Sequence, residues 1–496
     1  MDFDVIVLGS GLAGLTCASR LSKLGFKVGV FEKHHIPGGY ATNFKRRGYN
    51  FDVSLHGIGA LSEGGNTHNI LTHCGVLNKI KPLKNPTAYY VPYKGTLLDI
   101  PNEVNLYKKL LFDLFPNEIK NIDRLFNDIN KFKLGFENLI LNKEASIFKK
   151  INTNTLMFIK WSEKTTDQVV RSYVDNEDFI YIFTALWPYY GLPPKKLSAL
   201  YYFIPWISYH IYGKYYIEGG AQSLSNALVE VITENGGAVN LKSEVININF
   251  EGNKAKGITL KNNETFTAKY IVSNINPIHT FKMVKDYEVP KKYLEKINSY
   301  TVGCSLSQLY LGLDCHPSEL NIPVEEVFYF EKGTPEENYE LSLSSNYEKC
   351  GMLLTNYSSM DESLNEHNKG TIAVTIIDNY NNWSKDKAKY ALQKEELKNI
   401  LIDRLEEKFE GIKNHICVAE LGTPRTMERY TNNPLGAVYG YAQTVKQAGR
   451  HRLPSKTPVS NLFLASAWVN PGGGYEGSIS SGMVVAQELY KKLKWM

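Results

Sequence analysis

The chain has 496 residues with 43% hydrophobic and 22% charged side chains and a net charge of +5. This length exceeds one compact core, so we expect two domains or one domain with a large insertion. The mild charge, without a sustained basic run, leads us to expect no nucleic-acid partner. Six cysteines without a CxxC pair or metal-ligand spacing predict reduced thiols and no metal site.

Nothing in the sequence predicts secretion or a membrane span. The first apolar run begins at residue 4, before a basic leader would fit, so we expect no signal peptide. No segment reaches the ~20 apolar residues of a spanning helix. The closest, 197–213, holds six aromatic residues but is interrupted by Pro205 and His210. Such aromatics suit a membrane interface, the wall of an apolar tunnel or ordinary core. We expect a cytoplasmic protein and leave peripheral association with the inner face of the membrane open.

The first predicted elements carry the strongest motif. An apolar β-branched run over 4–8 predicts a buried parallel strand, and 12–24 predicts a helix that ends at Gly25. A second strand is predicted over 27–31, and Glu32 follows it directly. The order strand, glycine-rich turn, helix, strand and acid is typical of a dinucleotide-binding fold.

The turn before the helix reads Gly9-Ser10-Gly11-Leu12-Ala13-Gly14. In this pattern Gly9 permits the tight turn, Gly11 lets a pyrophosphate approach the backbone, and Gly14 lets the helix pack on the strand. The helix N-terminus then offers unpaired N–H groups to the phosphates. Glu32 is placed to accept hydrogen bonds from a ribose, which disfavours a 2′-phosphate and favours NAD or FAD over NADP.

The next segment favours FAD. Gly38 and Gly39 follow Glu32 by six residues and offer a second close approach, suited to a ribityl diphosphate. With this segment the sequence resembles the phytoene desaturase, carotenoid isomerase and retinol saturase group of FAD enzymes. That group carries a matching E-K-x-x-x-x-G-G segment and then a G-Y-x-F-D segment, here 32–39 and 48–52. Residues 54–59 resemble the retinol saturase branch, and the saturase and isomerase branches look closer than the desaturases.

The resemblance implies an α/β fold in which a mixed α+β substrate domain is inserted into a Rossmann-type FAD-binding domain, as in amine oxidases and phytoene desaturases. The parallel sheet of that domain carries a β-meander. We expect the FAD-binding domain at 1–100, 215–276 and 455–496. The substrate-binding domain is expected at 101–214 and 277–454, with a helical lid over 102–187.

The remaining elements are predicted from periodicity. A helix that opens within 216–224 and runs through Glu234 precedes strands at 239–241, 245–248 and 270–274 in the FAD-binding domain. In the substrate domain we expect strands at 307–311 and 370–377 and a helix over 386–409. A last parallel strand at 461–467 precedes a glycine-rich turn at 471–477 and a helix from Ser478 to Leu493.

The C-terminal turn also satisfies GxGxxG, but no second strand or ribose acid follows it, so we expect no second dinucleotide site. We expect the N–H groups near Ser478 and Ile479 to donate to the flavin ring instead. No Asp is present at the place where many flavoproteins bind the ribityl chain. Phytoene desaturases lack it too. The full set of expected cofactor contacts is Gly9, Gly11, Leu12, Ala13, Gly14, Glu32, Lys33, Gly38, Gly39, Tyr40, Ala41, Leu55, His56, Gly57, Val245, Asn274, Ala467, Trp468, Gly474, Gly477, Ser478 and Ile479.

A flavin transfers hydride, so the protein must bind the substrate and manage one proton. Candidates for that proton are His56, Tyr475 and Glu476. His56 has the alternative role of bonding a loop carbonyl, and Glu476 that of a helix N-terminal charge. The resemblance implies desaturation, saturation or cis-trans isomerisation of a hydrophobic polyene or other lipid, with an electron partner that is not identified. The alternatives are an amine or amino-acid oxidase on the same scaffold and a non-catalytic binding protein.

Overall fold

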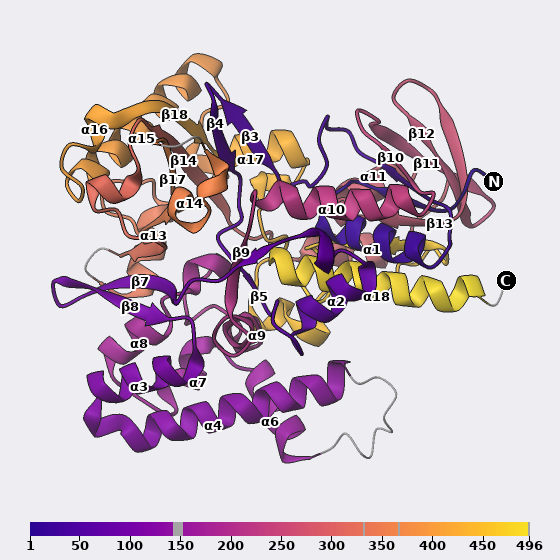
Figure 1. The fold of residues 1–496 in the computed structure, drawn as a ribbon. Helices are drawn as coiled ribbons and strands as arrows, with labels where there is room; N and C mark the ends of the chain where they lie inside the picture. The colour runs from indigo at the N-terminus through magenta and orange to yellow at the C-terminus, as the bar shows by residue number, and fades with distance from the viewer. Residues whose placement is uncertain (142–151, 331–332, 366–367, 495–496) are drawn as a thin grey trace.

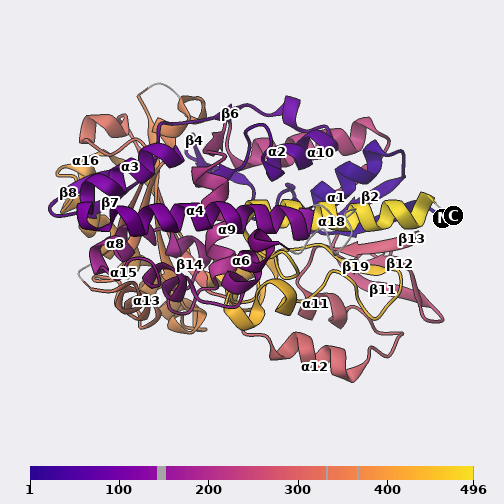
Figure 2. The same cartoon turned by 90° about the horizontal axis from the view of Figure 1, so that it is seen from below.

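Two seven-stranded sheets organise the chain in the computed structural model, which describes residues 1–141, 152–330, 333–365 and 368–494 (Figure 1). One sheet lies with the two ends of the chain, and the other lies at the opposite end of the molecule. A layer of helices built from residues between 104 and 210 lies below both in this view, and Figure 2 shows the molecule from the side of that layer.

The first sheet is the predicted nucleotide-binding sheet. Its parallel part has the order β10-β2-β1-β13-β19, and it continues antiparallel from the first half of β13 through β12 to β11. The strands are β1 (Phe3–Leu8), β2 (Val28–Phe31), β10 (Ala238–Asn240), β11 (Val245–Glu251), β12 (Lys254–Leu260), β13 (Thr265–Ser273) and β19 (Leu462–Leu464). The run 5–8 is completely buried, as expected for a parallel strand covered on both faces. The predicted fold class, with its meander, is confirmed.

Three helices complete this unit: α1 (Leu12–Lys23), α10 (Ala221–Glu234) and α18 (Gly474–Lys494). Helix α1 matches its predicted range closely, and α10 begins within the predicted segment 216–224 and ends at the predicted Glu234. Gly25 follows α1 in a left-handed conformation with φ of +88°. Helices α1 and α18 pack against each other, because Gly482 brings the backbones together. A Cβ at that position would lie 2.2 Å from the Ala13 carbonyl oxygen.

The second sheet has the order β18-β14-β17-β16-β15-β7-β8 and is antiparallel except between β15 and β7. The strands are β7 (Thr87–Tyr93), β8 (Thr96–Pro101), β14 (Ser305–Leu313), β15 (Glu326–Tyr329), β16 (Met352–Asn356), β17 (Gly370–Asp378) and β18 (Ile416–Gly422). Helix α15 (Lys387–Glu406) covers one face. The predicted strands at 307–311 and 370–377 and the predicted helix over 386–409 are confirmed.

Strands β7 and β8 lie within the segment 1–100 that we assigned to the FAD-binding domain, yet they pair with the second sheet. Their position in the sequence carries no information on which sheet they join. The division into two domains stays a prediction. The β7–β8 hairpin joins the second sheet, although its residues belong almost entirely to the segment assigned to the FAD-binding domain.

The predicted helical segment contains α3 (Val104–Leu114), α4 (Ile119–Phe136), α6 (Thr153–Ser162), α7 (Thr166–Arg171) and α8 (Glu177–Phe183), and α9 (Ala199–His210) follows it. Residues 142–151 of this prediction lie outside the described residues. On α9, Tyr202, Phe203 and Trp206 are buried in an aromatic core, so the core interpretation of segment 197–213 is correct for that face. Within the described part of the chain, no helix is both long enough and apolar enough to cross a membrane.

Shorter elements connect these layers. The strands are β3 (Asn43–Arg46), β4 (Tyr49–Asp52), β5 (Ile58–Gly59), β6 (Pro82–Leu83) and β9 (Lys214–Ile217). The helices are α2 (Asn66–Cys74), α11 (Pro277–Lys282), α12 (Lys291–Ser299), α13 (Pro335–Leu343), α14 (Tyr357–Met360), α16 (Ile412–His415) and α17 (Pro424–Thr431).

Candidate functional site

The carboxyl ends of the parallel strands meet at one edge of the first sheet. Leu8 pairs with both Phe31 and Ser273, so the residues that follow these three lie side by side. Those residues are Gly9, Glu32 and Asn274. In open α/β sheets this edge is where ligands bind.

The glycines of the first turn are required by close contacts. Gly9 has φ of +87°, a conformation that favours glycine. A Cβ on Gly14 would lie 2.6 Å from the Gly9 carbonyl oxygen, and one on Gly11 would lie 2.5 Å from Asn274 Oδ1. Gly11 is the N-cap of α1 and supplies no side-chain cap, so the N–H groups of the first turn of α1 are left for a ligand.

Glu32 is held in place at this edge. Its Oε2 accepts hydrogen bonds from the Ser10 N–H and the Ser10 hydroxyl, both at 2.8 Å. Its Oε1 accepts from the His34 N–H at 2.8 Å. An ionised carboxylate has about four acceptor positions, so three bonds leave capacity for a ribose hydroxyl. The donor set therefore fits the adenosine half of a dinucleotide.

A second glycine turn adjoins the first. Gly38 and Gly39 have φ of +122° and +63°, and Gly38 N–H donates to the Ser10 carbonyl at 3.0 Å. A Cβ on Gly39 would lie 3.4 Å from the Gly11 Cα. The two turns thus form one cradle in which glycine backbone lies against glycine backbone, which fits the close approach of a diphosphate.

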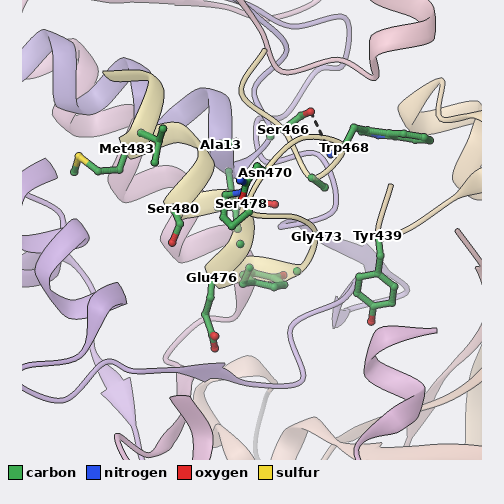
Figure 3. A pocket seen from close by; sticks show the side chains of 18 of the residues that line it. Ala13, Tyr439, Ser466, Trp468, Asn470, Gly473, Glu476, Ser478, Ser480 and Met483 are labelled. Atoms are coloured by element: carbon green, nitrogen blue, oxygen red, sulfur yellow. Dashed lines mark hydrogen bonds between the residues drawn. The ribbon is translucent and has the colours of Figure 1, made fainter. Parts of the chain in front are cut away.

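The C-terminal turn differs from the prediction. Helix α18 begins at Gly474, four residues before the expected Ser478 (Figure 3). The first four N–H groups of a helix lack intrahelical partners, so the free groups belong to the turn at Gly474–Glu476. Those of Ser478 and Ile479 lie one turn further in, and the prediction that they donate to the flavin does not fit this helix start.

The glycines of that turn serve packing. A Cβ on Gly477 would lie 2.7 Å from the Gly472 carbonyl oxygen, and one on Gly473 would lie 2.6 Å from the Tyr439 carbonyl oxygen. The glycines are therefore required by close backbone contacts, and their presence does not prevent the segment from starting a helix.

A cavity of about 1580 Å³ joins these turns. Three of the predicted cofactor contacts, Gly14, Leu55 and Ile479, lie outside its lining. Gly14 has the packing role described above, and the side chains of Leu55 and Ile479 are fully buried in the core. The predicted contacts that line the cavity are Gly9, Gly11, Leu12, Ala13, Glu32, Lys33, Gly38, Gly39, Tyr40, Ala41, His56, Gly57, Val245, Asn274, Ala467, Trp468, Gly474, Gly477 and Ser478.

The cavity continues from the sheet edge to the helical layer. There its wall is mostly apolar and comes from α4, α6 and the face of α9 opposite its core side. The wall includes Phe136, Phe158, Ile159, Tyr201, Ile204 and Pro205. Sites for one drug-sized ligand enclose about 300–1,000 Å³. The volume is therefore sufficient for a cofactor together with a second, hydrophobic molecule.

All three predicted proton-handling residues line this one cavity. Glu476 extends from the start of α18, and its Oε1 accepts from the Gly59 N–H at 2.6 Å (Figure 3). Burial raises the pKa of Glu476 to about 7, although Gly59 and Ser208 favour the ionised form. Glu476 is therefore half protonated near neutral pH.

Tyr475 is engaged differently. Ser54 Oγ donates its proton to the Tyr40 carbonyl oxygen at 2.7 Å. The Tyr475 hydroxyl lies 3.0 Å from Ser54 Oγ, so Tyr475 has to be the donor in the hydrogen bond between these two hydroxyls. Burial holds the pKa of the Tyr475 hydroxyl well above its usual value. Its proton is thus already committed within the protein.

His56 contacts a buried charge cluster that the sequence did not reveal. Its Nδ1 lies 3.0 Å from Glu326 Oε1, and Glu326 Oε2 lies 2.7 Å from Lys214 Nζ. Glu325 binds the same ammonium at 3.0 Å. In the sequence, this cluster is indicated only by the adjacent acids Glu325 and Glu326 at the start of the apolar strand β15. Their partners Lys214 and His56 are more than a hundred residues away, so the sequence does not indicate the pairing.

Metal-binding side chains gather elsewhere. Asp314, Cys315 and His415 place ligand atoms within 4.8 Å of one another, the one such group among the described residues, and none of the three lines the cavity.

Comparison with known proteins agrees with the resemblance. The sequence profile of the flavin-containing amine oxidoreductase family matches residues 12–490. The chain is 25% identical to an all-trans-retinol 13,14-reductase of Danio rerio, over 98% of this chain and 86% of that protein. It is 26% identical to a chloroplastic prolycopene isomerase of Daucus carota, over 98% and 80%. The solved structure of putrescine oxidase bound to putrescine superposes with a TM-score of 0.64 over 99% of both chains, at 15% identity, which shows the shared fold.

Proposed function

Because the chain belongs to the family of flavin-containing amine oxidoreductases, and is thus a flavin-dependent oxidoreductase, we propose that it uses FAD to act on carbon–carbon bonds of a hydrophobic polyene or related lipid. The observation that carries this proposal is the single cavity, which runs from the dinucleotide cradle to an apolar wall on α4, α6 and α9. A long apolar substrate fits such a wall better than a small charged amine does.

FAD fits the residues present. The turn 9–14 and the N-terminus of α1 would hold its diphosphate, Glu32 its adenosine ribose and the backbone of Val245 its adenine. The flavin ring would then lie toward the turn at Gly474–Glu476, whose free N–H groups favour negative charge. Bound FAD supplies an atom, N5, that accepts or donates a hydride.

The chain's own residues supply the rest. The apolar wall positions a hydrophobic substrate and keeps water away from it. Of the three predicted candidates, His56 and Glu476 can exchange a proton with a ligand in the cavity, because the Tyr475 hydroxyl already donates to Ser54 Oγ. The relatives, a retinol reductase and a prolycopene isomerase, support this substrate class and leave saturation, desaturation and isomerisation as the reactions to be distinguished.

The first test is the visible absorption spectrum of the purified protein before any addition. We expect a flavin band, and a structured polyene spectrum over it would indicate a bound substrate. The protein is then incubated without oxygen with retinoids and carotenoids, with the flavin oxidised or chemically reduced, and the products are separated. An Ile204→Trp variant should block the apolar wall and lower polyene turnover while it retains the flavin.

Two results would replace the proposal. Release of hydrogen peroxide with ammonia or an aldehyde from amines, without polyene turnover, would indicate an amine oxidase. A bound flavin that no substrate or reductant bleaches or reoxidises would indicate a binding protein.

We also propose that the protein lies in the cytoplasm and associates peripherally with a membrane through the helical layer. Exposed apolar side chains on α3, α4 and α6 support this: Leu106, Ile119, Leu156 and Ile159. Ile159 also lines the cavity, so a lipid-soluble substrate would have a short path. The protein should float with liposomes. Leu156→Glu should reduce flotation more than Leu392→Glu, a matched change at an exposed leucine on α15.

A further inference from the structure

The charge cluster next to His56 surrounds the Glu326 carboxylate, and both of its oxygens have two partners each. Glu326 is fully buried and begins β15, where its cross-strand neighbour on β16 is Thr355. Oε2 accepts from Lys214 Nζ at 2.7 Å and from the Tyr189 hydroxyl. Oε1 faces His56 Nδ1 at 3.0 Å and accepts more weakly from the Thr355 hydroxyl at 3.5 Å.

Lys214 keeps this carboxylate ionised. Burial opposes ionisation of Glu326, but the Lys214 charge and the hydrogen bonds from His56 and Lys214 outweigh it, and the pKa of Glu326 lies below its usual value. Burial instead raises the pKa of Glu325, the other partner of Lys214. The two carboxyls therefore differ: Glu326 is the stable anion and contacts His56, and Glu325 contacts Lys214 and Asn85.

The position of the imidazole proton follows from these partners. An ionised carboxylate only accepts hydrogen bonds. Thr355 Oγ, 2.9 Å from Nδ1, has its proton directed at Glu326 and is also an acceptor. Nδ1 therefore has to carry the proton, and neutral His56 has its lone pair on Nε2. Nε2 has no hydrogen-bond partner among the described residues, and His56 lines the cavity.

The tyrosines around the ring do not compete for this role. Tyr189 and Tyr357 stack on the imidazole with centroids at 5.7 and 6.2 Å. Burial raises the pKa of both hydroxyls well above the usual value, so both are neutral. Both tyrosines therefore pack against the imidazole, and Thr355 and Glu326 contact its Nδ1.

We propose that Glu326 is a positioning residue that holds His56 as the Nδ1–H tautomer, so that Nε2 is the atom that exchanges a proton with the substrate. This inference rests on the proposed function. In desaturation, one hydrogen leaves the substrate as hydride to the oxidised flavin. The other leaves as a proton to Nε2, and its C–H electron pair becomes the new π bond. In saturation, the imidazolium returns that proton to carbon, and the hydride comes from the reduced flavin. The buried Glu326 anion stabilises the imidazolium in both directions.

The tautomer can be measured without any turnover. The flavin-loaded protein is labelled with ¹⁵N-histidine, and two-bond ¹H–¹⁵N spectra assign the protonated ring nitrogen, with His56→Gln identifying the signal. We expect a protonated Nδ1 and an unprotonated Nε2 in the neutral ring. A protonated Nε2 in the wild-type protein would overturn the proposal, and this result does not depend on any variant folding.

The kinetic test uses matched variants. Glu326→Gln and Glu325→Gln each remove one carboxylate from Lys214, but only the first removes the partner of His56. We expect Glu326→Gln to lower kcat by about 10²-fold or more, the usual contribution of a proton-transferring group, with KM within about threefold, and Glu325→Gln to leave kcat within about threefold. Equal losses in both variants would refute the positioning role. If the wild-type protein converts no polyene, the proposed function fails, and the ¹⁵N spectrum still decides the tautomer.

Discussion

Glu476 gives the most quantitative prediction, because its environment changes the pH dependence of stability. Its pKa in the folded protein is about 7, against a usual value of 4.5. At 1.36 kcal/mol per unit, a difference of about 2.5 units corresponds to at most about 3.4 kcal/mol. The sign follows from proton binding. Between these two pKa values the folded protein retains a proton that the unfolded chain has lost, so the free energy of unfolding falls as pH rises through this window.

Glutamine has no such titration. From pH 5 to pH 8 we expect the free energy of unfolding of Glu476→Gln, relative to the wild-type protein, to rise by about 2.5 kcal/mol. Urea unfolding at both pH values, followed by tryptophan fluorescence, measures this difference. Glu264→Gln, a change at an exposed carboxyl, is the control. Infrared difference spectra should show a protonated carboxyl at pH 6 that Glu476→Gln lacks.

A relative change below about 0.5 kcal/mol between pH 5 and pH 8 would refute this reasoning. Glu476 would then ionise as an ordinary carboxyl and would be an anion at neutral pH. It could accept a proton in the cavity but could not donate one.

Three further substitutions test other parts of the site. Gly14→Ala would place a Cβ 2.6 Å from a backbone oxygen and should abolish flavin retention, which is measured as the ratio of flavin to protein absorbance. The control Gly25→Ala, whose Cβ would have no atom within 4 Å, should retain the flavin. Glu32→Gln should weaken FAD binding about tenfold, or about 1.4 kcal/mol, in a fluorescence titration, and unchanged affinity would argue against the ribose contact. Lys214→Met should cost about 3–5 kcal/mol of stability in urea unfolding by leaving a buried anion unpaired, and adding Glu326→Gln should recover part of this loss.

The cradle could be predicted from the sequence because its signals are local. The strand, turn, helix and acid between residues 4 and 32 follow one another directly, and the backbone contacts of Gly9 and Gly14 arise within that unit. The later strands were predicted from periodicity, and the resemblance to a known family assigned them to the same sheet. Local spacing is sufficient where an element and its partner are neighbours in the chain.

The cluster behind His56 could not be predicted in this way. Lys214, Glu326 and Thr355 come from three strands that only the folded topology brings together. The acidic pair Glu325-Glu326 is the one local signal, and it does not indicate its partners. The predicted start of α18 at Ser478 was wrong for a related reason. Its glycines indicated a flexible turn, whereas they permit contacts with Tyr439 and with the preceding backbone, which the sequence does not display.

The close packing of α1 against α18 has a consequence for biosynthesis. The cradle needs β1 and α1 from the beginning of the chain, but β19 begins 439 residues and α18 begins 451 residues after the end of α1 at Lys23. At a synthesis rate of about 5–20 residues per second, this takes roughly 20 to 90 seconds. During that time the apolar edge of β13 has no β19 beside it, and Gly482 is not yet against Ala13. The cradle is therefore complete, with α18 packed on α1, only late in the synthesis of the chain.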